Sequence, residues 1–251
     1  MLRPFIEYTF RFPVWRMEID TLNDTLLVEL RDQGDKRVYF SSLDLKTGKI
    51  HFDEFKPEER WLTGIETAHD GVLLLHNYQS DAGPAHKGLV AIDATTGNIL
   101  WRDYNLAFNH LSINGPVFYD ARLQPRKYLL GDIKTGAALR KHEPSIDLEL
   151  SKELRLPNEI SAEYALSLGL PVHAAGNTVH YVEHNNFRIV SLHAIADTKL
   201  QQHLFIMNND QIIYHDLLHA DIQKLQPESF LLYKDQLISL KNQSQLEVLN
   251  L

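Results

Sequence analysis

The sequence contains no cysteine among its 251 residues. Disulfides, thiolate metal sites, iron–sulfur clusters and a cysteine nucleophile are therefore excluded. Positive charge is also scarce, because 25 Lys and Arg residues face 33 Asp and Glu residues, which gives a formal net charge of -8. A protein that binds nucleic acid normally carries a basic surface that neutralises phosphates. We therefore expect no nucleic-acid partner.

Long apolar segments are missing as well. The apolar runs are short, such as residues 72–75, whereas a membrane-spanning helix needs about 20 apolar residues. Near the N-terminus, Arg3, Glu7 and Arg11 interrupt what would be the apolar part of a signal peptide. We therefore expect no membrane partner and a cytoplasmic location, with which the lack of cysteine agrees.

One turn with the pattern Asp-x-x-Thr-Gly occurs three times, at residues 44–48, 93–97 and 132–136. The Asp side chain accepts a hydrogen bond from a backbone N–H two residues on, and the glycine takes a positive φ angle. Strand-like runs precede and follow each turn, so each copy predicts a β-hairpin. Two weaker copies without the glycine lie at residues 191–198 and 239–244.

These five turns define five units of roughly 50 residues. One or two further strand-like runs precede each hairpin, and four short strands repeated in this way are typical of a β-propeller blade. We predict an all-β fold, a single β-propeller of five blades that are four-stranded antiparallel sheets. The predicted blades are residues 13–57, 58–106, 107–144, 160–207 and 208–251.

Two parts of the chain need separate treatment. Residues 1–12 predict a strand that pairs with the last blade and closes the ring, which would remove an exposed edge. The predicted strands include residues 162–168 in the fourth blade and residues 211–221 in the fifth. Residues 142–170 leave open a short helix or an excursion between blades.

The second unit reads Ala91-x-Asp93-x-x-Thr96-Gly97-x-x-x-Trp101. This pattern resembles the repeat of quinoprotein-like (PQQ-type, WD40-like) β-propellers. The resemblance implies that Trp101 packs against a peptide plane in the neighbouring blade; Phe52 and Arg140 occupy its position in the first and third units. The quinone enzymes of that class resemble larger propellers with more blades and often a disulfide, so we expect no cofactor here.

The chain also resembles an uncharacterised bacterial domain-of-unknown-function family. The residues that carry this resemblance are Pro13-Val-Trp15-Arg16, Trp61-Leu-Thr-Gly64, Leu74-Leu75-His76-Asn-Tyr78 and Pro84-x-His86-Lys87-Gly88. The resemblance covers most of the first half of the chain. It implies a propeller-like domain and supplies no activity.

Residues able to bind a ligand gather in the first two units. Aromatic rings beside a guanidinium group are common anchors for ligands, and imidazole, phenol and ammonium groups suit an anionic or sugar-like ligand. The alternative is that the tryptophans pack between blades and that the histidines lie at a solvated hairpin tip. The candidate ligand-binding residues are Trp15, Arg16, Trp61, His76, Tyr78, His86 and Lys87.

A second candidate site is a metal site near the C-terminus, formed by His215, His219 and Asp221. The two histidines share one face whether the segment is a helix or a strand, and this spacing suits zinc. The alternative is a polar strand face whose histidines contact solvent or backbone carbonyls.

The sequence marks a repeated scaffold without a catalytic motif, since it has neither G-x-S-x-G nor a phosphate-binding loop. We therefore predict a non-catalytic binding or interaction module, whose partner is a protein or a small-molecule ligand at one face or in the central channel. The alternative is a propeller hydrolase that acts on a sugar-like substrate through paired carboxylates. Its candidate residues are Asp20, Glu66, Asp70 and Asp120.

Overall fold

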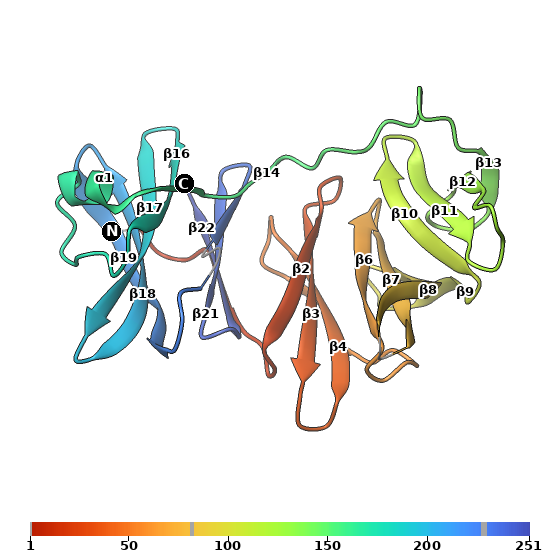
Figure 1. Cartoon of the computed structure of the whole chain (residues 1–251), viewed down its shortest axis with the longest axis horizontal. Coiled ribbons are helices and arrows are strands. Elements are labelled where there is room, and N and C mark those ends of the chain that lie inside the picture. Colours follow the sequence, from red (N-terminus) through yellow and green to blue (C-terminus); the bar gives the residue numbers. More distant parts are fainter. Residues whose placement is uncertain (1, 81–82, 227–229) are drawn as a thin grey trace. The chain divides into compact units, whose positions relative to one another are not determined.

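The computed structural model describes residues 2–80, 83–226 and 230–251. In these parts the chain forms five antiparallel sheets of four or five strands and one short helix (Figure 1). Within each sheet, most neighbouring strands are also consecutive along the chain, as in a propeller blade. The predicted all-β class with five blade-like sheets is confirmed. No helix in the described residues has the length and hydropathy needed to cross a membrane.

The chain divides into two compact units, which are described separately. The three-sheet unit comprises Phe12–Lys152, and the two-sheet unit comprises Met1–Arg11 together with Glu153–Leu251. The single five-bladed ring stays a prediction.

The three-sheet unit contains three consecutive up-and-down sheets. The first runs through β2 (Val14–Asp20), β3 (Thr25–Asp32), β4 (Arg37–Asp44) and β5 (Ile50–Phe55). The second runs through β6 (Thr63–His69), β7 (Val72–Ser80), β8 (Gly83–Asp93) and β9 (Ile99–Asp103). The third runs through β10 (Leu106–Ser112), β11 (Gly115–Asp120), β12 (Tyr128–Gly131) and β13 (Ala138–Lys141).

The two-sheet unit contains two five-stranded sheets. One has the order β15 (Asn158–Ser161), β16 (Thr178–His184), β17 (Phe187–Ala196), β18 (Lys199–Asn208) and β19 (Gln211–Ile222), with α1 (Ala162–Ser167) beside it. The other has the order β1 (Ile6–Thr9), β22 (Gln245–Asn250), β21 (Gln236–Lys241), β20 (Phe230–Tyr233) and β14 (Leu154–Arg155).

The three Asp-x-x-Thr-Gly turns form as their chemistry predicts. In the turn that begins at Asp93, the side-chain Oδ1 atom accepts hydrogen bonds from the backbone nitrogens of Thr95 and Thr96, at 3.0 and 2.7 Å. Gly97 donates its N–H to the backbone oxygen of Asp93 and has a φ angle of 75°. The turns at Asp44 and Asp132 repeat this arrangement.

The same turns receive aromatic side chains from the preceding sheet. Trp101 on β9 lies over Gly136 of the next sheet and donates its indole N–H to the backbone oxygen of Ile133 at 2.7 Å. Phe52 on β5 occupies the equivalent place over Gly97. A side chain at either glycine would therefore meet an aromatic ring, so the repeated glycine serves both the turn and the packing between sheets.

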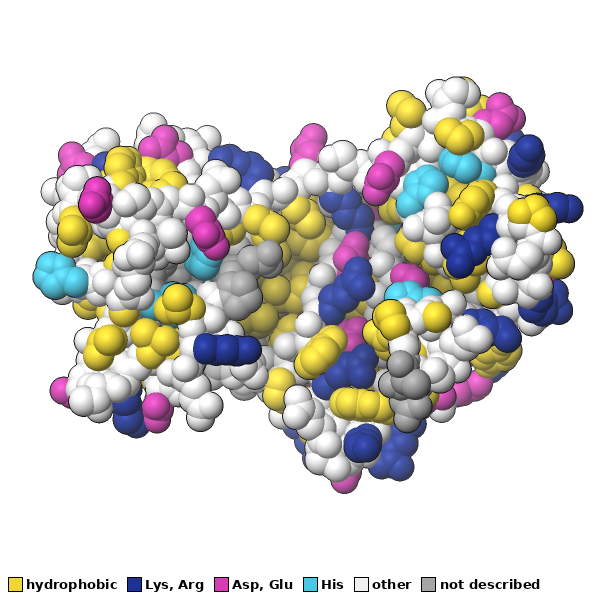
Figure 2. Space-filling view, in the orientation of Figure 1, with side chains coloured by type: hydrophobic (Ala, Val, Ile, Leu, Met, Phe, Trp, Pro, Cys, Tyr) yellow, Lys and Arg dark blue, Asp and Glu magenta, His cyan; other side chains and the backbone are white. Residues whose placement is uncertain are grey.

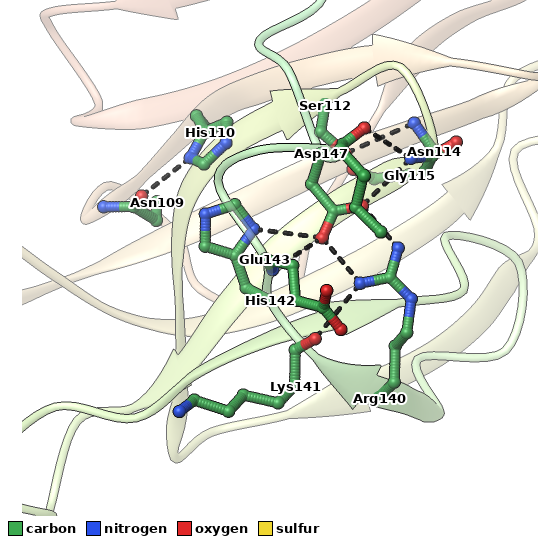
Figure 3. A network of polar contacts seen from close by, with 11 residues as sticks. Asn109, His110, Ser112, Asn114, Gly115, Arg140, Lys141, His142, Glu143 and Asp147 are labelled. Atoms are coloured by element: carbon green, nitrogen blue, oxygen red, sulfur yellow. Dashed lines mark hydrogen bonds and ion pairs between the residues drawn. The ribbon is translucent and has the colours of Figure 1, made fainter.

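The third sheet has Arg140 at this repeated position, and its guanidinium group binds Asp147 instead (Figure 3). Asp147 is buried and also accepts hydrogen bonds from the Asn114 side chain at 2.9 Å and the Glu143 backbone nitrogen at 2.8 Å. The Arg140 hydrogen bond holds the pKa of Asp147 well below its usual range. This network fixes the chain that follows β13 against the third sheet.

Apolar cores lie between adjacent sheets of the three-sheet unit. Leu27 and Phe40 of the first sheet pack with Ile65, Leu73 and other residues of the second. A second cluster joins the second and third sheets, where Phe118 and Ile133 meet residues of β7 and β8. These cores place the faces of β2, β3 and β6 in fixed positions relative to one another.

In the two-sheet unit, β1 pairs with β22, with Ile6 opposite Val248; that this pairing closes a ring stays a prediction. The boundary between the fourth and fifth blades is different from that predicted. Residues 211–221 belong to β19, which pairs with β18 in the fourth sheet. Asn209 and Asp210 have φ angles of 46° and 66°, which suit a two-residue hairpin turn between these strands.

The prediction of a strand at residues 162–168 is wrong, because residues 162–167 form α1. Ser161 caps this helix by accepting a hydrogen bond from the backbone nitrogen of Glu163 at 3.2 Å. Ala165 is buried against the fourth sheet. The N-cap serine and the helix-forming residues Ala, Glu and Leu outweigh the short alternation of apolar residues.

Candidate functional site

The candidate ligand-binding residues come from the first two sequence repeats, and most of them meet at one face of the three-sheet unit. Figure 2 shows that basic and acidic side chains alternate there in a column, with hydrophobic and histidine side chains beside it. We call this group the aromatic site. Its members are Trp15, Arg16, Arg31, Trp61, Glu66, His76, Tyr78 and His86.

Irregular strand pairing positions two residues of this group. Val14 pairs with Leu30 and Arg16 with Glu29, so Trp15 is an additional residue in β2. Glu66 is an additional residue in β6 in the same way, because the pairing of β6 with β7 shifts between Ile65 and Thr67. A β-bulge redirects the side chain that it inserts, and such bulges are common next to functional sites.

Arg31 lies between two indole rings. Its guanidinium carbon is 5.4 Å from the ring centre of Trp15 and 4.7 Å from that of Trp61. The outer indole is open to solvent, since 64% of the surface of Trp15 is exposed. The cation–π contacts therefore hold an exposed aromatic surface in place.

The charge of Arg31 is neutralised within the protein. Its Nε atom donates to Glu29 Oε1 at 2.8 Å, and two further nitrogens donate to the backbone oxygens of Trp61 and Thr63 at 3.1 and 2.8 Å. Both Arg31 and Glu29 are buried. The pair therefore braces the first sheet against the second.

A cavity with a volume of about 370 Å³ opens beside the indoles. Cavities of this size accept small ligands. It is lined by Trp15, Arg31, Trp61, Leu62, Tyr78, Ser80, Gly83 and Pro84.

Two imidazole rings stack next to this cavity. The rings of His76 and His86 have centres 3.6 Å apart and an angle of 6° between their planes. Tyr78 contacts both rings edge-on, with centre distances of 4.7 and 5.1 Å. His86 Nδ1 lies 2.6 Å from Glu66 Oε1, and His76 Nδ1 lies 3.7 Å from the same oxygen.

Burial sets the electrostatics of this cluster. It lowers the pKa of His76 to about 3, with smaller effects from His86, Arg16 and Arg31, so His76 is neutral at neutral pH. Burial also raises the pKa of Glu66, which the hydrogen bond from His86 partly offsets. Among the residues that the structure describes, neither ring nitrogen of His76 has a hydrogen-bond partner, and an unsatisfied buried polar group of this kind costs about 1–3 kcal/mol.

The structure brings together all the predicted ligand-site residues except Lys87. Arg16 donates to the backbone oxygen of Glu66 at 3.3 Å. Lys87 follows His86 in β8, and its charge acts on Asp120 in the third sheet. Whether the group binds a ligand stays a prediction.

Arg31 was missed as a site residue, although the sequence contains a signal for it. Glu29 and Arg31 are charged residues two positions apart in the otherwise apolar run of β3, so they share one face of a buried strand. Such a pair indicates an internal ion pair.

Among the carboxylates of the hydrolase alternative, only Glu66 belongs to the aromatic site. Asp20 is buried and accepts hydrogen bonds from the backbone nitrogens of Asp70 and Gly71 at 3.2 and 2.7 Å. Asp70 pairs with Lys134, and Asp120 pairs with Arg122 of its own turn. These three carboxylates hold turns and sheets together.

The residues of the predicted C-terminal metal site do not converge. His215 Nε2 lies 3.1 Å from His203 Nδ1, and Asp221 pairs with Lys199. Among the described residues, the group of His, Asp and Glu side chains whose ligand atoms lie within 4.8 Å of one another is Glu66, His76 and His86. Register shifts in the pairing of β18 with β19 disturb the regular alternation on which the prediction depended.

His193 in the same sheet gives a testable pH dependence. Burial, together with His180 and His219, lowers its pKa to about 4 from 6.5, and its Nε2 atom accepts a hydrogen bond from the backbone nitrogen of Gln226. In the unfolded chain the His193 imidazole has its ordinary pKa of 6.5. As the pH falls, it is therefore protonated in the unfolded chain before it is protonated in the folded chain. The stability from neutral His193 is thus complete above pH 6.5 and falls toward pH 4.

We expect this one group to remove about 2 kcal/mol of unfolding free energy between pH 8 and pH 5. His193→Gln keeps a hydrogen-bond acceptor and should lack this part of the pH dependence. Urea unfolding followed by circular dichroism at both pH values measures the difference. Parallel pH profiles for the two proteins would contradict the assignment.

Comparisons with known proteins find a family model that resembles part of the chain. No curated protein matches the sequence. Among solved structures, an uncharacterized protein, lmo1340, from Listeria monocytogenes EGD-e is similar with 11% identity and a TM-score of 0.35, over 95% of this chain and 77% of that one. An endo-arabinase from Bacteroides thetaiotaomicron VPI-5482 is similar with 10% identity and a TM-score of 0.29, over 99% of this chain and 96% of that one.

At these TM-scores the structural likenesses carry no argument about function. The family comparison is more local, and it covers Glu29, Arg31, Trp61 and the cluster of Glu66 with the two stacked histidines. Residues 19–101 match the model of a family described as Domain of unknown function (DUF4905), in agreement with the resemblance expected from the sequence.

Proposed function

We propose that the protein is a non-catalytic binding domain that holds a neutral, sugar-like ligand against the indoles of Trp15 and Trp61. The observation that carries this proposal is the exposed, braced indole of Trp15 at the edge of a cavity of about 370 Å³. An aromatic ring fixed in an open position offers a flat apolar surface without an entropic cost of ordering it.

The charges at the cavity favour a neutral ligand over an anionic one. Arg31 lines the cavity, but Glu29 neutralises it and three of its nitrogens already donate within the protein. Lys87, the other cation expected to meet an anion, is not among the residues that line the cavity. Tyr78 and Ser80 supply hydroxyl groups at the cavity, which can donate to and accept from the hydroxyls of a sugar.

Isothermal titration calorimetry tests this proposal with cellotetraose and xylotetraose as neutral probes and tetragalacturonate as the anionic probe. We expect at least one neutral probe to bind and Trp15→Ala to weaken it by about tenfold or more, since that change corresponds to about 1.4 kcal/mol. Trp101→Phe is the matched control, because Trp101 packs on Gly136 and does not line the cavity.

Three results would overturn the proposal. The first is that neither neutral probe binds. The second is that tetragalacturonate binds more tightly than both neutral probes, and the third is that Trp15→Ala leaves the affinity for the neutral probe unchanged. Chromatography of the same mixtures after incubation tests whether the protein cleaves the oligosaccharides. Shortened oligosaccharides would favour the hydrolase alternative, in which Glu66 would act.

A further inference from the structure

Three side chains from three strands of the second sheet converge beside the cavity. Glu66 comes from β6, His76 from β7 and His86 from β8. One ligating atom from each lies within 4.8 Å of the other two. Around a tetrahedral zinc ion with bonds of about 2.0–2.1 Å, neighbouring ligand atoms lie roughly 3.3 Å apart. The two oxygen–nitrogen distances of 2.6 and 3.7 Å bracket that separation, and the stacked imidazoles must rotate apart for both nitrogens to point at one ion.

His76 supplies a second, independent observation. It is 2% exposed, and within the described part of the chain both of its ring nitrogens lack a hydrogen-bond partner. An ion pair between Glu66 and His86 would explain the position of those two residues, but it would leave His76 without a partner. Native proteins rarely bury such a group without a reason.

The surroundings of the cluster keep His76 available as a ligand. A Cβ atom at Gly64 would lie 3.0 Å from Glu29 Oε2 and 3.1 Å from His76 Cε1, so a larger residue there would displace the imidazole. Arg31 pairs with Glu29 and Arg16 with Glu18, whereas Glu66 Oε1 faces the two imidazoles, at 2.6 Å from His86 Nδ1 and 3.7 Å from His76 Nδ1. The neighbouring cations are thus already compensated, and the Glu66 carboxylate is directed at the histidines.

We propose that Glu66, His76 and His86 bind one divalent transition-metal ion. Two imidazoles and one carboxylate suit zinc and the other first-row divalent ions, and they leave at least one coordination position for water or a ligand. The proposal does not depend on sugar binding.

The test uses the full chain after treatment with a chelator, with zinc chloride as the probe. Equilibrium dialysis with elemental analysis should show one zinc ion per chain at micromolar free zinc. We expect His86→Ala and Glu66→Gln to weaken binding by more than about 100-fold, because loss of a ligand exceeds the effect of losing an outer contact. His86 is chosen because 31% of its side chain is exposed, and circular dichroism verifies that the variant folds.

His184→Ala is the matched control. His184 Nε2 lies 2.9 Å from Asp235 Oδ1, so it is also a histidine–carboxylate pair, but it belongs to no group of three ligands among the described residues. This variant should bind zinc as the unaltered protein does. The proposal would be overturned if His86→Ala binds zinc with the stoichiometry and affinity of the unaltered protein. It would also be overturned if His184→Ala loses as much zinc affinity as His86→Ala does.

A measurement on the unaltered protein avoids any dependence on folding of the variants. Cobalt(II) added to the chelator-treated chain should give visible absorption bands of nitrogen and oxygen coordination, which zinc then removes. Cobalt that binds without these bands, or no binding of either ion, would overturn the proposal.

Discussion

Gly136→Ala is expected to lower the unfolding free energy of the three-sheet unit by about 3–4 kcal/mol, from backbone strain and overpacking together. Gly136 has a φ angle of 72°, and a Cβ atom there would lie 2.6 Å from the indole of Trp101. The indole is held by its hydrogen bond to Ile133, so it cannot move aside without losing that bond.

Gly97→Ala is the matched control for this prediction. Gly97 occupies the same place in its turn with a φ angle of 75°, but the nearest atom to its Cβ position is a Phe52 carbon at 3.5 Å. Only the strain of a left-handed residue remains, which costs about 1–2 kcal/mol. Urea unfolding followed by tryptophan fluorescence reports on this unit, because all 3 tryptophans of the chain lie within it. If Gly136→Ala and Gly97→Ala lower the unfolding free energy by equal amounts, the packing of Trp101 on Gly136 is contradicted.

Arg31→Met is expected to cost about 3–5 kcal/mol in the same unfolding measurement, because it leaves a buried carboxylate without its partner. Glu29 is 1% exposed and, among the described residues, would keep the hydrogen bond from the backbone nitrogen of Ile65. Trp15 and Trp61 would also lose the cation between them.

Two further variants separate this explanation from a loss of packing. Glu29→Gln combined with Arg31→Met removes both charges and should recover a large part of the stability. Arg122→Met breaks an exposed ion pair with Asp120 and should leave the stability nearly unchanged. If the double variant is as unstable as Arg31→Met alone, the buried ion pair does not explain the effect.

The hairpins were predictable because their determinants are local. An Asp that accepts from the next backbone nitrogens and a glycine with positive φ specify the turn within five residues, as the turn at Asp93 shows. The β18–β19 hairpin was assigned to the wrong blades because Asn209 and Asp210 form a turn without the repeated motif. The helix α1 was left open beside a strand because six residues with mixed apolar spacing satisfy both a strand and a helix pattern.

The candidate site was predictable only in part. His76, Tyr78 and His86 meet because β7 and β8 form one hairpin, which the sequence indicates. Glu66 joins them through a β-bulge in β6, and a bulge shifts one residue out of the alternation that sequence analysis assumes. The stacking of Arg31 between Trp15 and Trp61 depends on the packing of two sheets, which no local pattern specifies.

The most direct test of the proposed function is a nitrogen–proton correlation spectrum of the three indole N–H groups during titration with cellotetraose or xylotetraose. Trp15 and Trp61 line the cavity, whereas the Trp101 indole is bonded to Ile133 in the core between sheets. We predict that a bound neutral probe shifts the Trp15 and Trp61 signals and leaves the Trp101 signal in place. Binding that shifts neither cavity indole, or that shifts Trp101 alone, would contradict the proposal that this face is the binding site.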